Sequence, residues 1–388
     1  MSSLRILDAL TPRAMMKAAF EVMQLSAETF RLLTPGQDGR VAWQEFRNKL
    51  QAYDLFGHVD FTLRLPEGVE LPLAELVARA SALETYRAVW ATEGVGHYFA
   101  ENRRRKEGAL RGLLGEENTR GLPPHCLIAL HTGMGLSLAE CALSSANARG
   151  SDSDVQPVLR RFDTLCRDNS REGYTGATFE ALGLVARNLY PHMIPAIDGH
   201  LRTLGEELLG YFWHGVGRGI YFAPTNFLPF GSSPWWAVKM TEEEPPHELG
   251  RLNALSGLAF ALTLVNIREP EILEAFLRHH GDRLSAGGAI LNGITSSLVV
   301  WCASTRDDPY LAWLSQHRPA RRAPGVSELW ETWVSRACED ARRRFYPALT
   351  EHRALGEVFR YQSLPGLLER LGREPRAGAF AGGAARAR

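Results

Sequence analysis

Three histidines and one glutamate stand close to glycines that recur along the chain. His97, His131 and His214 each lie within three residues of such a glycine, and Glu93 precedes His97 by four residues. A spacing of four places Glu93 and His97 on one face of a helix, where carboxylate and imidazole groups can transfer protons or bind a metal ion. We take these four residues as the catalytic candidates, with hydrogen-bonded core or rim histidines as the alternative. The sequence assigns no metal ligands and identifies no cofactor.

A second set of residues could bind a substrate. Arg218 could hold a carboxylate or phosphate, with a structural salt bridge as the alternative. Trp213 and Tyr221 belong to an aromatic-rich stretch that runs into a long irregular segment, and long segments of this kind often bind ligands. The stretch indicates an apolar, aromatic-lined site, with core packing as the alternative. Thr132 and Thr175, each directly before a recurring glycine, complete the set, with helix N-capping as their alternative role.

Composition and missing motifs exclude several classes of function. The 44 basic residues balance the 44 acidic ones, so no net field attracts nucleic acid or an anionic bilayer. The five cysteines form no CxxC pair and no metal-ligand spacing, which predicts a reduced, cytoplasmic protein. The chain has no Walker loop, GxSxG elbow, HExxH motif or helical ExxH pair. No reaction is therefore defined by a motif.

Two stretches, residues 219–238 and 284–305, are long enough to be considered as membrane spans. Neither stretch contains a charged residue. The first holds three prolines and the second holds several glycine, serine and threonine residues, whose polar groups would need partners in lipid. We therefore expect buried helices or loops and a chain that does not itself span a membrane.

The recurring glycines form an internal repeat. Six segments share the order polar, glycine, apolar, small, and their leading glycines are 39, 43, 39, 42 and 36 residues apart. They are Glu93-Gly-Val-Gly, Thr132-Gly-Met-Gly, Thr175-Gly-Ala-Thr, His214-Gly-Val-Gly, Ser256-Gly-Leu-Ala and Asn292-Gly-Ile-Thr. Apolar residues continue at helical spacing, and segments such as 270–281 between the copies carry helix start and stop signals. The repeating unit is therefore predicted to be a pair of helices of about 40 residues.

This repeat predicts an all-α protein. Six helical pairs would form a closed α/α toroid or a tight solenoid, preceded by a small α+β segment in which Val59–Leu65 alternates like a strand. Glycine costs about 1 kcal/mol within a helix, so its recurrence indicates close helix packing. We divide the chain into an N-terminal segment, the repeat domain, a linker, a C-terminal helical extension that caps the repeats, and a disordered tail, at residues 1–85, 86–315, 316–326, 327–375 and 376–388.

The register of the repeat makes a further prediction about the site. If the six units superpose, the residues before the leading glycines form one polar ring in the inner layer. These residues are Glu93, Thr132, Thr175, His214, Ser256 and Asn292. We expect any chemistry to occur there, with Glu93 and His214 in acid–base roles and Arg218 holding an anion. The alternative is a ring that only satisfies hydrogen bonds between helices.

Several glycine segments resemble a known bacterial family. Residues 86–97, 127–135, 171–176 and 213–222 are similar to motifs of a family of unknown function that includes accessory proteins encoded beside enediyne polyketide synthases. The similarity runs in order over residues 12–304. The chain departs from it at Phe179-Glu-Ala-Leu, where the enediyne members have an aromatic and histidine-rich stretch, and in its tail. The resemblance implies maturation of a linear polyene in a complex with a propeller-type partner and a membrane redox partner.

Two functions are consistent with the sequence. The first is an enzyme component that binds an apolar polyketide or polyene chain in the repeat core and assists its oxidation or rearrangement. The second is a non-catalytic scaffold that docks partner proteins on a concave face. A deep apolar pocket with convergent polar groups would favour the first function, and a broad open groove would favour the second.

Overall fold

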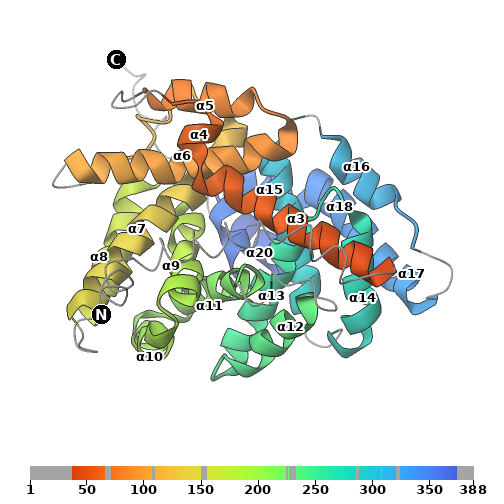
Figure 1. Cartoon of the computed structure of the whole chain (residues 1–388). Coiled ribbons are helices and arrows are strands. Elements are labelled where there is room, and N and C mark those ends of the chain that lie inside the picture. The colour runs from red at the N-terminus through yellow and green to blue at the C-terminus, as the bar shows by residue number, and fades with distance from the viewer. Residues whose placement is uncertain are drawn as a thin grey trace, which may run out of the picture.

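The protein is built from helices. The computed structural model describes residues 37–65, 71–106, 110–149, 155–223, 226, 233–284, 288–306, 308–319 and 324–373 (Figure 1). These ranges contain no β-strand, and one isolated bridge pairs Leu114 with Ser170, so the predicted all-α class is confirmed for them. The predicted disordered tail, 376–388, lies outside the described residues, as do residues 320–323 of the predicted linker.

Six helices carry the glycine pattern and form the inner layer. Each packs against the next one in chain order, as Figure 1 shows. They are α6 (Thr85–Lys106), α7 (Leu127–Arg149), α9 (Thr175–Leu189), α11 (Glu206–Tyr221), α13 (Glu248–Val265) and α15 (Ala289–Ser304). In α11 every residue from Leu209 to Tyr221 is buried, which is the property of a helix enclosed on all sides.

Five of these helices are followed by a helix of an outer layer. The outer helices are α8 (Val155–Asn169), α10 (Ile194–Leu204), α12 (Ser233–Glu243), α14 (Pro270–Leu284) and α16 (Pro309–Gln316). Their buried residues follow helical spacing, as Val158, Leu159 and Phe162 do in α8, so one side faces the inner layer. Between α6 and α7 the described chain has only loops and the short 3₁₀ helix η1 (Pro124–Cys126).

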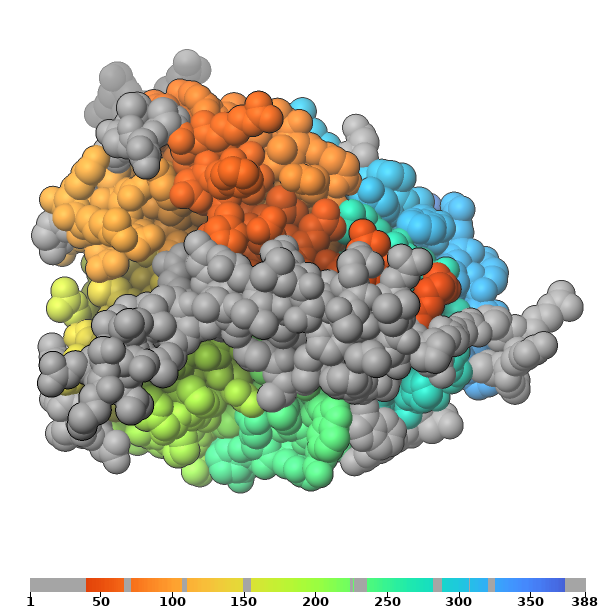
Figure 2. Space-filling view, in the orientation of Figure 1, coloured from red at the N-terminus to blue at the C-terminus, as the bar shows by residue number. Residues whose placement is uncertain are grey.

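The N-terminal helices cover one side of this body. α3 (Gln37–Gly57) crosses the front of the view in Figure 1, and α4 (Val59–Thr62) and α5 (Leu73–Ser81) lie beside α6. Figure 2 shows the same helices, coloured orange and red, together on one face of the molecule.

The predicted strand at Val59–Leu65 is wrong, because this segment begins with helix α4. Val59 and Leu63 are buried, whereas Phe61 between them is 84% exposed. Burial at a spacing of four follows the helical period, and a strand would have placed all three residues on one face. The apolar residues alternate in this segment because Phe61 is one of them, and the strand prediction assumed that Phe61 is buried.

The C-terminal extension is part of the core. A continuous helical run comprises α17 (Pro324–Trp330), the π-helical η5 (Glu331–Ser335), α18 (Arg336–Asp340), the π-helical η6 (Ala341–Phe345) and α19 (Tyr346–Glu351). It packs against α14, α15 and α16, and is followed by the 3₁₀ helix η7 (Leu355–Phe359) and α20 (Leu364–Arg373). Val358 and Phe359 in η7 are buried, and η7 packs against α9, α11 and α15.

Glycines lie where neighbouring inner helices cross. A Cβ atom at Gly133 would overlap the carbonyl of Glu93, and one at Gly96 would overlap the carbonyl of Leu130, so α6 and α7 meet backbone to backbone. The same contact joins Gly135 to Thr178, Gly183 to Phe212, Gly215 to Glu180, Gly217 to Ala254, Gly257 to His214, and Gly293 to Ser256. Only residues without a side chain permit this approach, and the packing gained offsets the cost of glycine in a helix.

These contacts revise the register of the third copy of the repeat. On α6, α11 and α13 the carbonyl that meets a glycine of the next inner helix belongs to the polar residue of the predicted pattern. On α9 it belongs to Glu180 and not to Thr175, whose following Gly176 faces Gly356 and the ring of Tyr211 instead. The third copy is therefore Glu180-Ala-Leu-Gly. It has alanine in the second position, where the other copies have glycine, and it has glycine in the fourth position.

Replacing a glycine at a helix crossing should destabilise the protein strongly. Gly215→Ala places a methyl group on the Glu180 carbonyl, and overpacking of this kind costs about 3 kcal/mol or more of the free energy of unfolding. Gly199→Ala is the matched control, because Gly199 is an exposed position of α10 with no atom near the added Cβ, and it should gain up to about 1 kcal/mol. Urea denaturation measures both, and equal stability of the two variants would contradict backbone contact at the crossing.

Candidate functional site

Four charged or titratable side chains meet in the centre of the inner layer. The Arg218 Nη1 atom lies 2.8 Å from Glu180 Oε2, and its Nη2 atom lies 3.6 Å from Glu93 Oε1. The His214 Nδ1 atom lies 2.9 Å from Glu180 Oε1. We call Glu93, Glu180, His214 and Arg218 the central cluster.

Three inner helices bring the central cluster together. His214 and Arg218 are four residues apart on one face of α11, Glu180 comes from the middle of α9, and Glu93 comes from the middle of α6. The glycine contacts fix the axial position of α9 relative to α11, because Gly215, which directly follows His214, packs on the Glu180 carbonyl. The same close approach that packs the backbones therefore places Glu180 beside both α11 side chains.

Burial of the central cluster perturbs its ionisation. The side chains of Glu180 and His214 are 0% exposed, that of Arg218 is 3% exposed and that of Glu93 is 9% exposed. Burial and the charge of Glu180 raise the pKa of Glu93, partly opposed by Arg218. Burial lowers the pKa of His214 despite its hydrogen bond to Glu180. Burial alone would lower the pKa of Arg218, but the two carboxylates outweigh it and raise that pKa.

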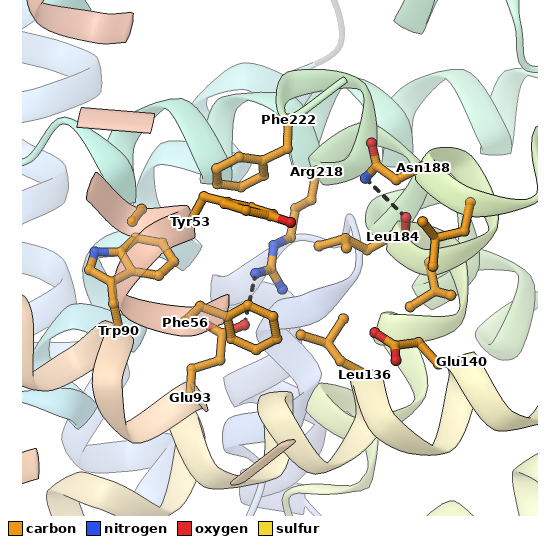
Figure 3. A pocket seen from close by; sticks show the side chains of 13 residues that line it. Tyr53, Phe56, Trp90, Glu93, Leu136, Glu140, Leu184, Asn188, Arg218 and Phe222 are labelled. Atoms are coloured by element: carbon orange, nitrogen blue, oxygen red, sulfur yellow. Dashed lines mark hydrogen bonds and ion pairs between the residues drawn. The ribbon is translucent and has the colours of Figure 1, made fainter. Parts of the chain in front are cut away.

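A cavity of about 90 Å³ adjoins the central cluster on the side of Glu93 and Arg218. Figure 3 shows the Arg218 side chain extending toward Glu93 among Tyr53, Phe56 and Phe222. The remaining lining residues come from α3, α6, α7 and α9 and are mainly apolar: Ala52, Trp90, Leu136, Glu140, Leu184, Val185, Asn188 and Leu189. Tyr53, Phe56 and Phe222 are only partly buried, so the cavity reaches the surface.

The charges around Arg218 decide which ligand the cavity suits. Both terminal nitrogens of the guanidinium already face carboxylates, one of Glu180 and one of Glu93. A ligand anion would add a third negative charge to a buried site with one fixed positive charge, which is unfavourable at low dielectric. The arrangement therefore suits a neutral, mostly apolar ligand better than the carboxylate or phosphate considered for Arg218 from the sequence.

His131 lies outside the central cluster and bonds with the backbone through both ring nitrogens. Its Nδ1 atom lies 2.7 Å from the carbonyl oxygen of Leu127, and its Nε2 atom accepts a hydrogen bond from the backbone N–H of Arg171 at 3.0 Å. The ring also stacks on Tyr174. With Nδ1 donating and Nε2 accepting, His131 is a neutral imidazole that joins α7 to the segment between α8 and α9.

His97 lies beside two residues that line the cavity. Its Nε2 atom is 3.3 Å from Glu140 Oε2, and its ring makes an edge contact with Phe56. Phe56 and Glu140 both line the cavity. His97 therefore packs against residues of the cavity wall without lining the cavity, although it belongs to the same helix as Glu93.

The other sequence candidates make structural contacts. The Trp213 Nε1 atom donates to Asp198 at 2.7 Å, and the Tyr221 hydroxyl accepts from Asn266 at 2.7 Å. Thr132 donates to the Ile128 carbonyl one turn earlier. Thr175 begins α9 and lines a separate cleft that also contains Arg360 and Glu357. The structure thus brings together Glu93, His214 and Arg218, and leaves Trp213, Tyr221, Thr132 and Thr175 away from the cavity.

The six residues predicted to form one polar ring do not do so: four of them form two separate groups, and Thr132 and Thr175 belong to neither. Glu93 and His214 belong to the central cluster, and Ser256 donates a hydrogen bond to Asn292 at 2.9 Å between α13 and α15. Glu180 takes the place expected for Thr175. Sequence reasoning missed Glu180 because it required glycine directly after the polar residue, whereas the pattern polar, small, apolar, small would have found it.

Comparison with known proteins does not assign the chain. No family profile, curated protein or solved structure shows significant similarity to it. Among the described residues, no group of three or more His, Cys, Asp or Glu side chains is placed to hold a metal ion. One described helical stretch, Pro124–Ala148, is long and apolar enough to cross a membrane, and 83% of its most apolar window is buried inside the protein, as in a core helix.

The stability of the protein should fall as His131 is forced to accept a proton. Burial lowers the pKa of His131 to about 4, compared with 6.5 in the unfolded chain. The unfolded state therefore binds more protons below pH 6.5, and stabilisation present above that pH is lost progressively toward pH 4. Between pH 6.5 and 5 the loss should be about 2 kcal/mol.

Urea unfolding at several pH values tests this prediction. The His131→Gln variant keeps a donor and an acceptor but cannot titrate, so its unfolding free energy should change less between pH 6.5 and 5 than that of the unmodified protein. Parallel pH dependences of the two proteins would show that His131 does not carry the effect.

Proposed function

We propose that the protein binds a neutral, largely apolar chain molecule in the cavity beside the central cluster and assists its rearrangement by proton transfer at Glu93. The observation that carries the proposal is the placement of a buried carboxyl group, whose pKa is raised, at the wall of an aromatic-lined cavity. This combination supports the enzyme component more than the scaffold, for which a broad groove would be expected.

The size of the cavity limits what it holds. About 90 Å³ is well below the 300–1,000 Å³ typical of pockets that enclose a whole ligand. The cavity therefore accommodates one segment of a longer chain, and the remainder of the chain extends past the partly buried rim of Tyr53 and Phe222. A linear polyene, the class that the family resemblance implies, has the narrow cross-section that this requires.

The proposed reaction consists of proton transfers and includes no redox step. Glu93 delivers a proton to one atom of a conjugated chain, and the carboxylate that remains, held by Arg218, takes a proton from another atom of the chain. The double bonds shift between the two positions, and the chain gains or loses neither protons nor electrons overall. Oxidation of the chain would fall to the membrane redox partner that the resemblance implies, with the propeller-type protein as the other member of the complex.

We further infer that the six inner helices close into a ring around the central cluster. The Tyr86 hydroxyl of α6 donates to the Val265 carbonyl at the end of α13, at 2.8 Å, and the Tyr86 ring lies 6.3 Å from that of Trp301 in α15. Contacts between α15 and α7 support the same arrangement. Closure of the inner layer supports a toroid more than an open solenoid.

Ligand binding can be tested with a fluorescent conjugated tetraene fatty acid and its methyl ester. The ester should bind with increased fluorescence, and the free acid at least tenfold more weakly, because the site has no uncompensated positive charge. Leu184→Trp, which fills the cavity, should abolish binding, whereas Leu208→Trp, at a partly buried leucine of α11 away from the cavity, should not. Preference for the acid, or unchanged binding by Leu184→Trp, would refute the site.

Catalysis is tested by the conservative change Glu93→Gln. This variant keeps the shape of the cavity but removes the transferable proton, so product formation in the producing organism should be lost while the melting temperature changes by only a few degrees. The control is Glu101→Gln, two turns further along α6, where the carboxylate pairs with the exposed Arg105. Normal product formation by folded Glu93→Gln protein would leave Glu93 without a catalytic role.

A further inference from the structure

The charges of the central cluster do not balance. With both carboxyl groups ionised, His214 neutral and Arg218 positive, the buried cluster carries a net charge of minus one, and an uncompensated buried charge is strongly destabilising. One additional proton restores neutrality. It can be bound by Glu93 at the cavity wall or by His214 in the interior, since Glu180 accepts from both Arg218 and His214.

We propose that Glu180 is a positioning residue that keeps Glu93 protonated, so that Glu93 meets the ligand as a hydrogen-bond donor and selects chains bearing a carbonyl or another neutral acceptor. This inference rests on the proposed function and deepens it, because it fixes the starting state of Glu93 and the class of ligand group that faces it. Glu180 itself does not touch the cavity and acts through Arg218.

The geometry places the additional proton on Glu93 rather than on His214. Both oxygens of Glu180 are engaged, one with His214 and one with Arg218 at 2.8 Å, so Glu180 is the close partner of the guanidinium. Glu93 is farther from Arg218, at 3.6 Å, and is the weaker partner.

His214 is poorly suited to hold a charge. Its Nε2 atom is buried without a hydrogen-bond partner, and its ring lies against Phe260 and Phe359. A second N–H on the imidazole would therefore be buried with no acceptor, which costs more than protonating Glu93 beside a cavity.

The groups around Glu93 on each neighbouring helix are consistent with this state. α9 contributes the negative charge of Glu180, α11 contributes Arg218, α7 contributes Glu140 on the far side of the cavity, and α6 itself contributes His97 one turn later. The burial of Glu93 and the charge of Glu180 both raise its pKa, and Arg218 alone opposes them.

Infrared difference spectroscopy of the ligand-free protein tests the inference. With glutamate carboxyl groups labelled with ¹³C, the protein near pH 7 should show the C=O band of a protonated, buried carboxyl group, and Glu93→Gln should remove that band. Glu180→Gln removes one negative charge and leaves Arg218 to pair with an ionised Glu93, so it should remove the band as well. Glu140→Gln, at the same cavity, should retain it.

His214→Asn separates the two possible positions of the proton. Because the additional proton is not on His214, this variant should retain the band. Absence of the band from the unmodified protein, its persistence in folded Glu180→Gln, or its loss in His214→Asn would each overturn the inference. If Glu180→Gln does not fold, the unmodified protein and His214→Asn still decide the outcome.

A binding experiment completes the test. The protein should bind a conjugated polyene aldehyde about tenfold more tightly than a polyene hydrocarbon of equal length, the difference expected of one net hydrogen bond, and Glu180→Gln should lose this preference. Equal affinity for the two chains would overturn donation by Glu93 while leaving apolar binding intact. Failure of both chains to bind, together with the expected infrared bands, would instead refute the proposed function alone.

Discussion

The close contact between glycine positions and backbone carbonyls of neighbouring helices determines the rest of the structure. Helices that touch through their backbones lie nearer to each other than helices separated by leucine side chains, and their relative height is fixed at the point of contact. In this protein the contact recurs from α6 to α15. On α6, α9 and α11 the carbonyl that meets a glycine of the next inner helix belongs to Glu93, Glu180 and His214, respectively, so one geometric constraint also brings these polar residues close together.

Burying these residues costs desolvation free energy, and the ion pairs and hydrogen bonds within the central cluster offset it. Arg218 places one terminal nitrogen against each carboxylate, and Glu180 uses its second oxygen for His214. Removing the Glu180 side chain would leave the Nδ1 atom of His214 buried without its partner, which is destabilising. Such a cluster is poor at adding stability, and it lies beside an aromatic-lined cavity.

Much of this architecture follows from the sequence. The helical pairs and the close approach at glycines could be predicted because both depend on local periodicity, and Glu93, His214 and Arg218 could be selected because they flank the glycines. Glu180 could not be found with a pattern that required glycine directly after the polar residue, since on α9 alanine takes that place. Local alternation also mispredicted Val59–Leu65, where only the packing of α4 shows that Phe61 faces outward.

The position of η7 has a consequence for the order in which the protein forms during synthesis. Val358 and Phe359 fill the core against α9 and beside His214, yet they follow all six glycine-bearing helices in the chain. While the ribosome still holds these residues, the inner layer has emerged but the end of its core next to His214 is exposed to water. A nascent chain at this stage carries unburied apolar surface, because η7 can complete the core only after all six inner helices have been synthesised.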